Sequence, residues 1–187
     1  MSLDERDGMI SEEKIGQLLA GVTEFPEYRV HFFQSGNPAP QFVDSIGGRA
    51  LIEADKGDSF HYFGITPKAG RQFSVKYGCV FKLATNEGGI GEPDDQATGT
   101  DGQDCPSIAP MTKSRYIKRI SAELIYPPTS PERRFRLSYR VWISEYNNPS
   151  RRDIEPDPNY WVGGGMDCGT ARDNFWITAM EFLASPA

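Results

Sequence analysis

The stretch Phe73-Ser-Val-Lys-Tyr-Gly-Cys-Val-Phe-Lys-Leu83 alternates apolar side chains with residues that are mostly small, polar or basic. A period of two is typical of an extended strand that buries one face and exposes the other. We therefore predict an antiparallel strand over residues 73–83 with one face in the core. Its apolar face carries Phe73, Val75, Tyr77, Cys79, Phe81 and Leu83.

Most of the remaining chain also reads as strand. Two long strands are predicted at 114–126 and 135–146, joined as a hairpin by a connection that contains three prolines and cannot continue either ladder. The apolar run from Phe175 to Leu183 fits a buried strand, or a helix capped by Asp173, and we favour the strand. Shorter strands are predicted at 28–35, 49–54 and 59–65.

One helix is predicted, over residues 10–22. Ser11 is a suitable N-cap, and an apolar stripe that begins at Ile15 follows it. Residues 1–9 are expected to form a flexible N-terminus. Because no helical pattern separates the strands, a βαβ organisation does not fit. The prediction is an all-β, mainly antiparallel fold of β-sandwich or jelly-roll-like type.

The chain length of 187 residues suits a single domain. Within it we expect a sandwich over residues 28–183, with long loops at 86–112 and 147–172. Nineteen glycines, 14 prolines and a hydrophobic share of 38% exclude a collagen, a coiled coil, a membrane span and a fully disordered chain.

Three cysteines do not make a disulfide framework. Cys79 is expected to be an inert core residue, and a single Cys105–Cys168 bridge stays open if the protein is exported. The first residues are acidic and lack the apolar run of a signal peptide. We therefore expect a cytoplasmic protein, with export as the alternative.

Charge is divided along the chain. Residues 113–152 carry a net charge of +7, residues 86–112 carry −6 and residues 153–187 carry −5, within a total of −6. Such blocks can steer a charged partner, or they can neutralise one another once the chain folds. We favour neutralisation.

The acidic loop at 86–112 is a candidate cation site. Calcium is bound by six to eight oxygen atoms, which carboxylates in a glycine-rich segment can supply. The spacing matches no known calcium loop, so no cofactor is the first expectation and calcium is an alternative. A mobile solvated loop, or one that touches a partner, fits the same residues. The candidate metal ligands are Asp94, Asp95, Asp101 and Asp104.

The predicted basic hairpin is a candidate site for an anionic ligand. Arg136 and Arg140 would lie on one face of their strand, where their guanidinium groups could bind phosphate or carboxylate. Nucleic acid is not favoured, because the whole chain is acidic and carries no RNA-binding or zinc motif.

The segment 159–174 has the ingredients of a sugar site. Aromatic rings stack on the C–H face of a sugar, and polar side chains hydrogen-bond its hydroxyls. Burial of Trp161 beneath the loop is the favoured alternative to its exposure. The candidate ligand-binding residues are Tyr160, Trp161, Asp167, Arg172, Asp173 and Asn174.

Three functions remain open. The favoured one is a non-enzymatic binding module that recognises a carbohydrate or a protein partner through its loops. The second is a self-assembling, capsid-like subunit whose charged segments meet between copies. The third is a hydrolase or metal-dependent enzyme that uses His31 or His61 with Cys168 or the loop carboxylates, although no GxSxG, HExxH or P-loop motif occurs.

Overall fold

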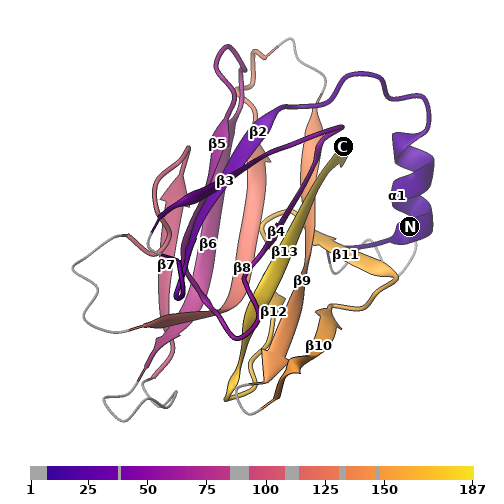
Figure 1. Cartoon of the computed structure of the whole chain (residues 1–187). Helices are drawn as coiled ribbons and strands as arrows, with labels where there is room; N and C mark the ends of the chain where they lie inside the picture. The colour runs from indigo at the N-terminus through magenta and orange to yellow at the C-terminus, as the bar shows by residue number, and fades with distance from the viewer. Residues whose placement is uncertain (1–7, 38, 85–92, 108–113, 131–133, 146–147) are drawn as a thin grey trace.

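The computed structural model describes residues 8–37, 39–84, 93–107, 114–130, 134–145 and 148–187. Within these ranges the chain forms thirteen strands and one short helix, and every strand pairing is antiparallel. The strands make three sheets with a sandwich-like arrangement (Figure 1). The prediction of an all-β fold is confirmed.

Sheet A is the largest sheet and is centred on two long strands, β9 (Phe135–Glu145) and β13 (Phe175–Pro186). The preference for a strand over a helix in the last apolar run is therefore confirmed. The outer strands of sheet A are β1 (Met9–Ser11), β4 (Arg49–Glu53), β10 (Asn148–Glu155) and β11 (Tyr160–Gly163).

Sheet C contains the strand from which the prediction began. In β6 (Ser74–Leu83) the side chains of Val75, Tyr77, Cys79 and Phe81 are buried, as the alternation predicts. β6 pairs with β7 (Asp95–Thr100) on one side and β8 (Arg115–Ile125) on the other, and β8 also pairs with β12 (Cys168–Gly169). Sheet B has the order β3 (Gln41–Asp44), β2 (Tyr28–Gln34) and β5 (Phe60–Pro67).

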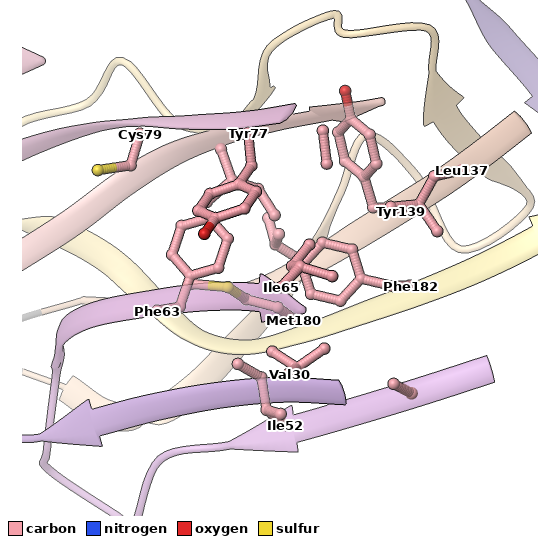
Figure 2. Close-up of a cluster of buried hydrophobic side chains, with 14 of the residues drawn as sticks. Val30, Ile52, Phe63, Ile65, Tyr77, Cys79, Leu137, Tyr139, Met180 and Phe182 are labelled. Atoms are coloured by element: carbon pink, nitrogen blue, oxygen red, sulfur yellow. The ribbon is translucent and has the colours of Figure 1, made fainter. Parts of the chain in front are cut away.

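The core lies where the three sheets meet (Figure 2). Phe63 of sheet B packs against Phe182 of sheet A at a ring-centroid distance of 6.3 Å and against Tyr77 of sheet C at 5.5 Å. Tyr139 of sheet A also belongs to this aromatic cluster, with its ring centroid 6.2 Å from that of Phe182. One aromatic ring from sheet B thus joins the inner faces of the other two sheets.

Helix α1 (Glu12–Leu19) lies at the opposite side of the molecule from β7 (Figure 1). Ser11 caps it as predicted, because its Oγ accepts a hydrogen bond from the backbone N–H of Lys14 at 3.2 Å. The helix is shorter than the predicted 10–22. Of the expected flexible N-terminus, residues 1–7 lie outside the described residues, whereas Met9 is ordered in β1 opposite Val162.

A β-bulge explains why the apolar phase of 114–126 is irregular. The register between β6 and β8 passes from Val80↔Arg119 to Phe81↔Ile117, so Lys118 is the extra residue. The bulge shifts the alternation by one position, which lets Ile117 and Ile120 both be buried.

The predicted hairpin of 114–126 and 135–146 is wrong. β8 belongs to sheet C and β9 to sheet A, so the proline-containing connection passes from one sheet to another. An apolar stripe fixes which face of a strand is buried but not which strand lies beside it.

Both predicted long loops contain strands. β10, β11 and β12 lie within 147–172, and β7 lies within 86–112. β10 and β7 are edge strands that pair on one side only, with β9 and β6 respectively. An edge strand tolerates Pro149 and polar residues on both faces, so its sequence resembles that of a loop.

Candidate functional site

The outer surface of sheet B is the best candidate for a functional site. Residues directly opposite each other in neighbouring strands point to the same side of a sheet. Tyr28, Val30 and Phe32 of β2 are buried in the core, so the alternate residues of β2 face outward. We call this surface the aromatic face, and it consists of Arg29, His31, Phe33, Phe42, Asp44, Tyr62 and the adjoining Asp104.

Aromatic rings cover the middle of this face. Phe33 and Tyr62 are stacked, with ring centroids 5.5 Å apart and an interplanar angle of 13°. Phe42 of the edge strand β3 is 61% exposed, which is unusual for so large an apolar side chain. The His31 ring lies 6.3 Å from Phe42 and 6.1 Å from Tyr62. The face therefore offers one open ring beside a packed aromatic group.

His31 is held by a carboxylate. Its Nε2 lies 2.7 Å from Oδ1 of Asp104, and both side chains are partly buried. Opposite His31 in β5 stands Gly64, and a Cβ atom at that position would lie 2.1 Å from Cε1 of His31. The imidazole thus occupies space that only glycine leaves open. Burial, together with the nearby charge of Asp104, raises the pKa of Tyr62.

An ion pair, Arg29–Asp44, lies beside Phe42. Arg29 donates to Asp44 through Nε at 2.7 Å and through Nη2 at 3.1 Å, and this bidentate contact lowers the pKa of the Asp44 carboxyl. The guanidinium carbon of Arg29 also lies 5.7 Å from the Phe42 ring centre. The pair is exposed to solvent, so its donors and acceptors are accessible to a ligand.

The aromatic face ends in a hollow of about 370 Å³. The hollow is lined by Arg29 and Asp44 together with Glu27, Thr66 and Lys68 among others. A second hollow of about 550 Å³ adjoins it, because both include Glu27 and Ser45 in their walls. The two hollows together thus carry carboxylates, the guanidinium groups of Arg29 and Arg71, and the ammonium group of Lys68.

Two of the residues expected to bind a ligand hold helix α1 instead. Trp161 is 0% exposed, and its indole N–H donates to the Glu12 carboxylate. Arg140 lies over the Trp161 ring at 4.2 Å and donates to Glu181 through Nε at 2.8 Å. The favoured alternative, a buried Trp161, is therefore confirmed, although its cover is helix α1 rather than a loop.

Of the other predicted ligand residues, Arg136 and Tyr160 lie in strands of sheet A, whereas Asp167 precedes β12 and residues 172–174 lie between β12 and β13. Arg172 stacks on Phe175 at 3.9 Å, and Asp173 forms an ion pair with Lys82 at 2.7 Å. Arg136 stands opposite Ser185 in sheet A. Tyr160 is half-buried in β11, whereas Asp167 and Asn174 are exposed.

The four aspartates of the predicted calcium site have different neighbours. Asp94 pairs with Lys118 at 3.2 Å, Asp95 is exposed at the start of β7, and Asp101 accepts from the backbone N–H of Val75 at 2.7 Å. Asp104 pairs with His31. In the part of the chain that the structure describes, no three His, Cys, Asp or Glu residues are placed to hold a metal ion.

The predicted Cys–His chemistry gains little support from the geometry. Cys168 is buried, its thiol donates to the carbonyl oxygen of Glu155 at 3.3 Å, and burial raises its pKa to about 12. At neutral pH it is a thiol rather than the nucleophilic thiolate. A Cys105–Cys168 disulfide is absent from the structure. All three cysteines are free, and the Sγ atom of Cys105 lies 3.5 Å from the Sγ atom of Cys79.

The charge blocks neutralise one another in part within the fold. From the basic block 113–152, Lys118 pairs with Asp94, Arg140 with Glu181, and Arg151 with Asp153 at 3.2 Å. These acids belong to the two flanking acidic blocks. The block pattern therefore does not by itself indicate a charged partner.

Sequence reasoning missed most of the aromatic face. The sequence places His31 with the loop carboxylates, Asp104 among them, only within the enzyme hypothesis, and nothing in the sequence points to Phe42. The alternation in Tyr28-Arg-Val-His-Phe-Phe33 does place Arg29, His31 and Phe33 on one side. Only the pairing of β2 with β3 and β5 shows that this side is joined by Phe42 and Tyr62.

No protein-family model matches the chain, and neither a curated protein nor a solved structure matches it. Among the described segments, no helix has the length and apolar character needed to cross a membrane.

Replacement of Gly64 by alanine tests whether the space opposite His31 matters. The new Cβ would overlap the imidazole, so Gly64→Ala should lower the free energy of unfolding by about 1–3 kcal/mol and shift the NMR resonances of His31. Gly16→Ala is the control, because nothing lies within 4 Å of that helical position, and it should raise stability by roughly 0.5–1 kcal/mol. Unchanged stability and unchanged His31 resonances in Gly64→Ala would contradict the description.

The pH dependence of stability should report on His61. Burial, reinforced by the charge of Arg115, lowers the pKa of His61 below its ordinary value of 6.5. The unfolded chain then takes up a proton at a higher pH than the folded chain does, so stability is lost as the pH falls below 6.5. Urea unfolding at about pH 7.5 and about pH 5.5 should show a smaller loss for His61→Gln than for the wild type. Equal losses would show that His61 does not titrate in this way.

Proposed function

We propose that the protein is a non-enzymatic carbohydrate-binding module whose ligand lies on the aromatic face. The observation that carries the proposal is the exposed Phe42 ring between two hydrogen-bonded side-chain pairs, His31–Asp104 and Arg29–Asp44. A large exposed aromatic ring next to ordered polar groups is typical of a recognition surface.

The chemistry of this face suits a sugar. A sugar ring has C–H groups on its faces and hydroxyls around its rim, so it needs an apolar platform and a surrounding set of donors and acceptors. Phe42 supplies the platform. Carboxylate oxygens of Asp44 and Asp104 can accept from hydroxyls, and Arg29 can donate to them. Because each charged group is already held by its partner, little side-chain freedom is lost when a ligand binds.

Binding is preferred to Cys–His hydrolysis because of the geometry around His31, His61 and Cys168. His31 is oriented by Asp104, whereas the thiol of Cys168 donates a hydrogen bond to the Glu155 carbonyl oxygen. His61 is buried near the Phe33 ring, at a distance of 5.7 Å between ring centres. A nucleophile and its general base must lie within hydrogen-bond reach of each other. The observed hydrogen-bond partner of Cys168 is the Glu155 carbonyl and that of His31 is Asp104.

A glycan array followed by calorimetry tests the proposal. The wild type should bind at least one class of glycan, and Phe42→Ala should weaken that binding by about tenfold or more through loss of the stacking platform. Ile125→Ala is the matched control, since Ile125 is also an exposed apolar residue but lies at the end of β8 in sheet C. Its affinity should equal that of the wild type.

Two results would contradict the proposal. One is the absence of binding to any glycan on the array. The other is a glycan that Phe42→Ala and the wild type bind with equal affinity, which would place the site elsewhere on the molecule.

A further inference from the structure

Two thiols face each other in the core at the junction of sheets B and C. Cys79 of β6 and Cys105 lie with their Sγ atoms 3.5 Å apart, and both side chains are buried. Neither residue takes part in the proposed ligand-binding surface. We propose that Cys79 and Cys105 form a reversible disulfide when the protein meets a peroxide.

The chain around Cys105 is firmly attached on both sides. The backbone of Cys105 exchanges two hydrogen bonds with Phe63 of β5, at 2.9 and 3.0 Å. On the β6 side, the hydroxyl of Tyr77 donates to the carbonyl of Gln103 at 2.6 Å, and Asp101 accepts from the backbone of Val75. Because residues 101–105 are tied to β5 and β6, the two thiols stay adjacent.

The distance between the sulfur atoms is close to what a disulfide requires. A bond of about 2.05 Å needs the two sulfurs to approach by only about 1.5 Å, which side-chain rotation and small backbone shifts can provide. Cys168 is oriented differently, because its thiol donates to the carbonyl oxygen of Glu155 at 3.3 Å. The geometry thus selects one pair out of the three cysteines.

The two thiols have different acidities. A hydrogen bond from the Cys79 thiol lowers the pKa of Cys105, whereas the same contact and burial raise the pKa of Cys79. Cys105 is therefore the more acidic of the two thiols, and we assign it as the sulfur that reacts first. A small oxidant suits a buried pair, which is why hydrogen peroxide is chosen in place of a bulky disulfide reagent.

The disulfide forms in two steps. The Cys105 thiolate attacks one oxygen of hydrogen peroxide, the O–O bond breaks, and Cys105 becomes a sulfenic acid with release of hydroxide. The Cys79 sulfur then attacks the Cys105 sulfur and expels the sulfenic oxygen. That oxygen leaves as water together with the Cys79 proton. The two thiols lose two electrons in total, and the peroxide gains them.

The test uses the full chain treated with hydrogen peroxide, denatured, alkylated and analysed by mass spectrometry. Two of three thiols should resist alkylation, peptide mapping should join the peptides of Cys79 and Cys105, and dithiothreitol should restore both thiols. Cys168→Ala is the control and should form the same crosslink, whereas Cys79→Ala should form none.

A second measurement does not depend on any variant. The crosslink joins residues 26 apart in sequence, so oxidised wild type should melt at a temperature higher than reduced wild type, by on the order of 5 °C. Three alkylated thiols after peroxide treatment, a crosslink that includes Cys168, or separate sulfinic acids at Cys79 and Cys105 would each overturn the proposal. None of these outcomes depends on whether a glycan binds.

Discussion

The pairing register of β2 with β5 is the constraint on which both the core and the candidate site depend. Val30 stands opposite Ile65 and Phe32 opposite Phe63, and all four side chains point into the core. The same register puts His31 opposite Gly64 on the outside. A slip of one residue would exchange the two faces and expose the apolar set. The burial energy that holds sheet B against sheets A and C therefore also fixes the position of the imidazole.

Ion pairs then join segments that are distant in sequence. Glu12 contacts both Arg140 and the Trp161 indole, so the start of helix α1 is held to sheet A by charge as well as by apolar packing. Lys118 is 1% exposed and lies within 3.8 Å of two carboxylates, those of Asp94 and Asp173. A buried ammonium group needs such partners, because an unpaired charge in the interior is strongly unfavourable. These ion pairs therefore stabilise the fold of the protein.

Much of the fold could be predicted because burial leaves a periodic mark on the sequence. The alternation in 73–83 identified β6, and Ser11 before an apolar stripe identified the start of helix α1. The identity of the neighbouring strand leaves no such pattern, and the predicted pairing of β8 with β9 is therefore wrong. The polar strand β7 resembles a loop because it is an edge strand, and the bulge at Lys118 interrupts the period.

The candidate site was harder to predict than the fold because its residues come from four separate segments. Composition drew attention to the Tyr160-Trp161 pair beside a glycine run, yet the indole is covered by helix α1. Phe42 stands in a short strand of four residues, where no period is visible and exposure cannot be inferred from the sequence. His31 and Asp104 are 73 residues apart, and only folding brings their side chains together.

The most direct test of the account is to map sugar binding by NMR on isotope-labelled protein. Glucose, galactose, mannose and N-acetylglucosamine would be titrated separately to millimolar concentrations. If the aromatic face binds the sugar, at least one sugar should shift the backbone resonances of residues 29–33 and 41–44 more than those of any other segment. Shifts confined to residues 160–174, or no shift with any of the four sugars, would contradict it.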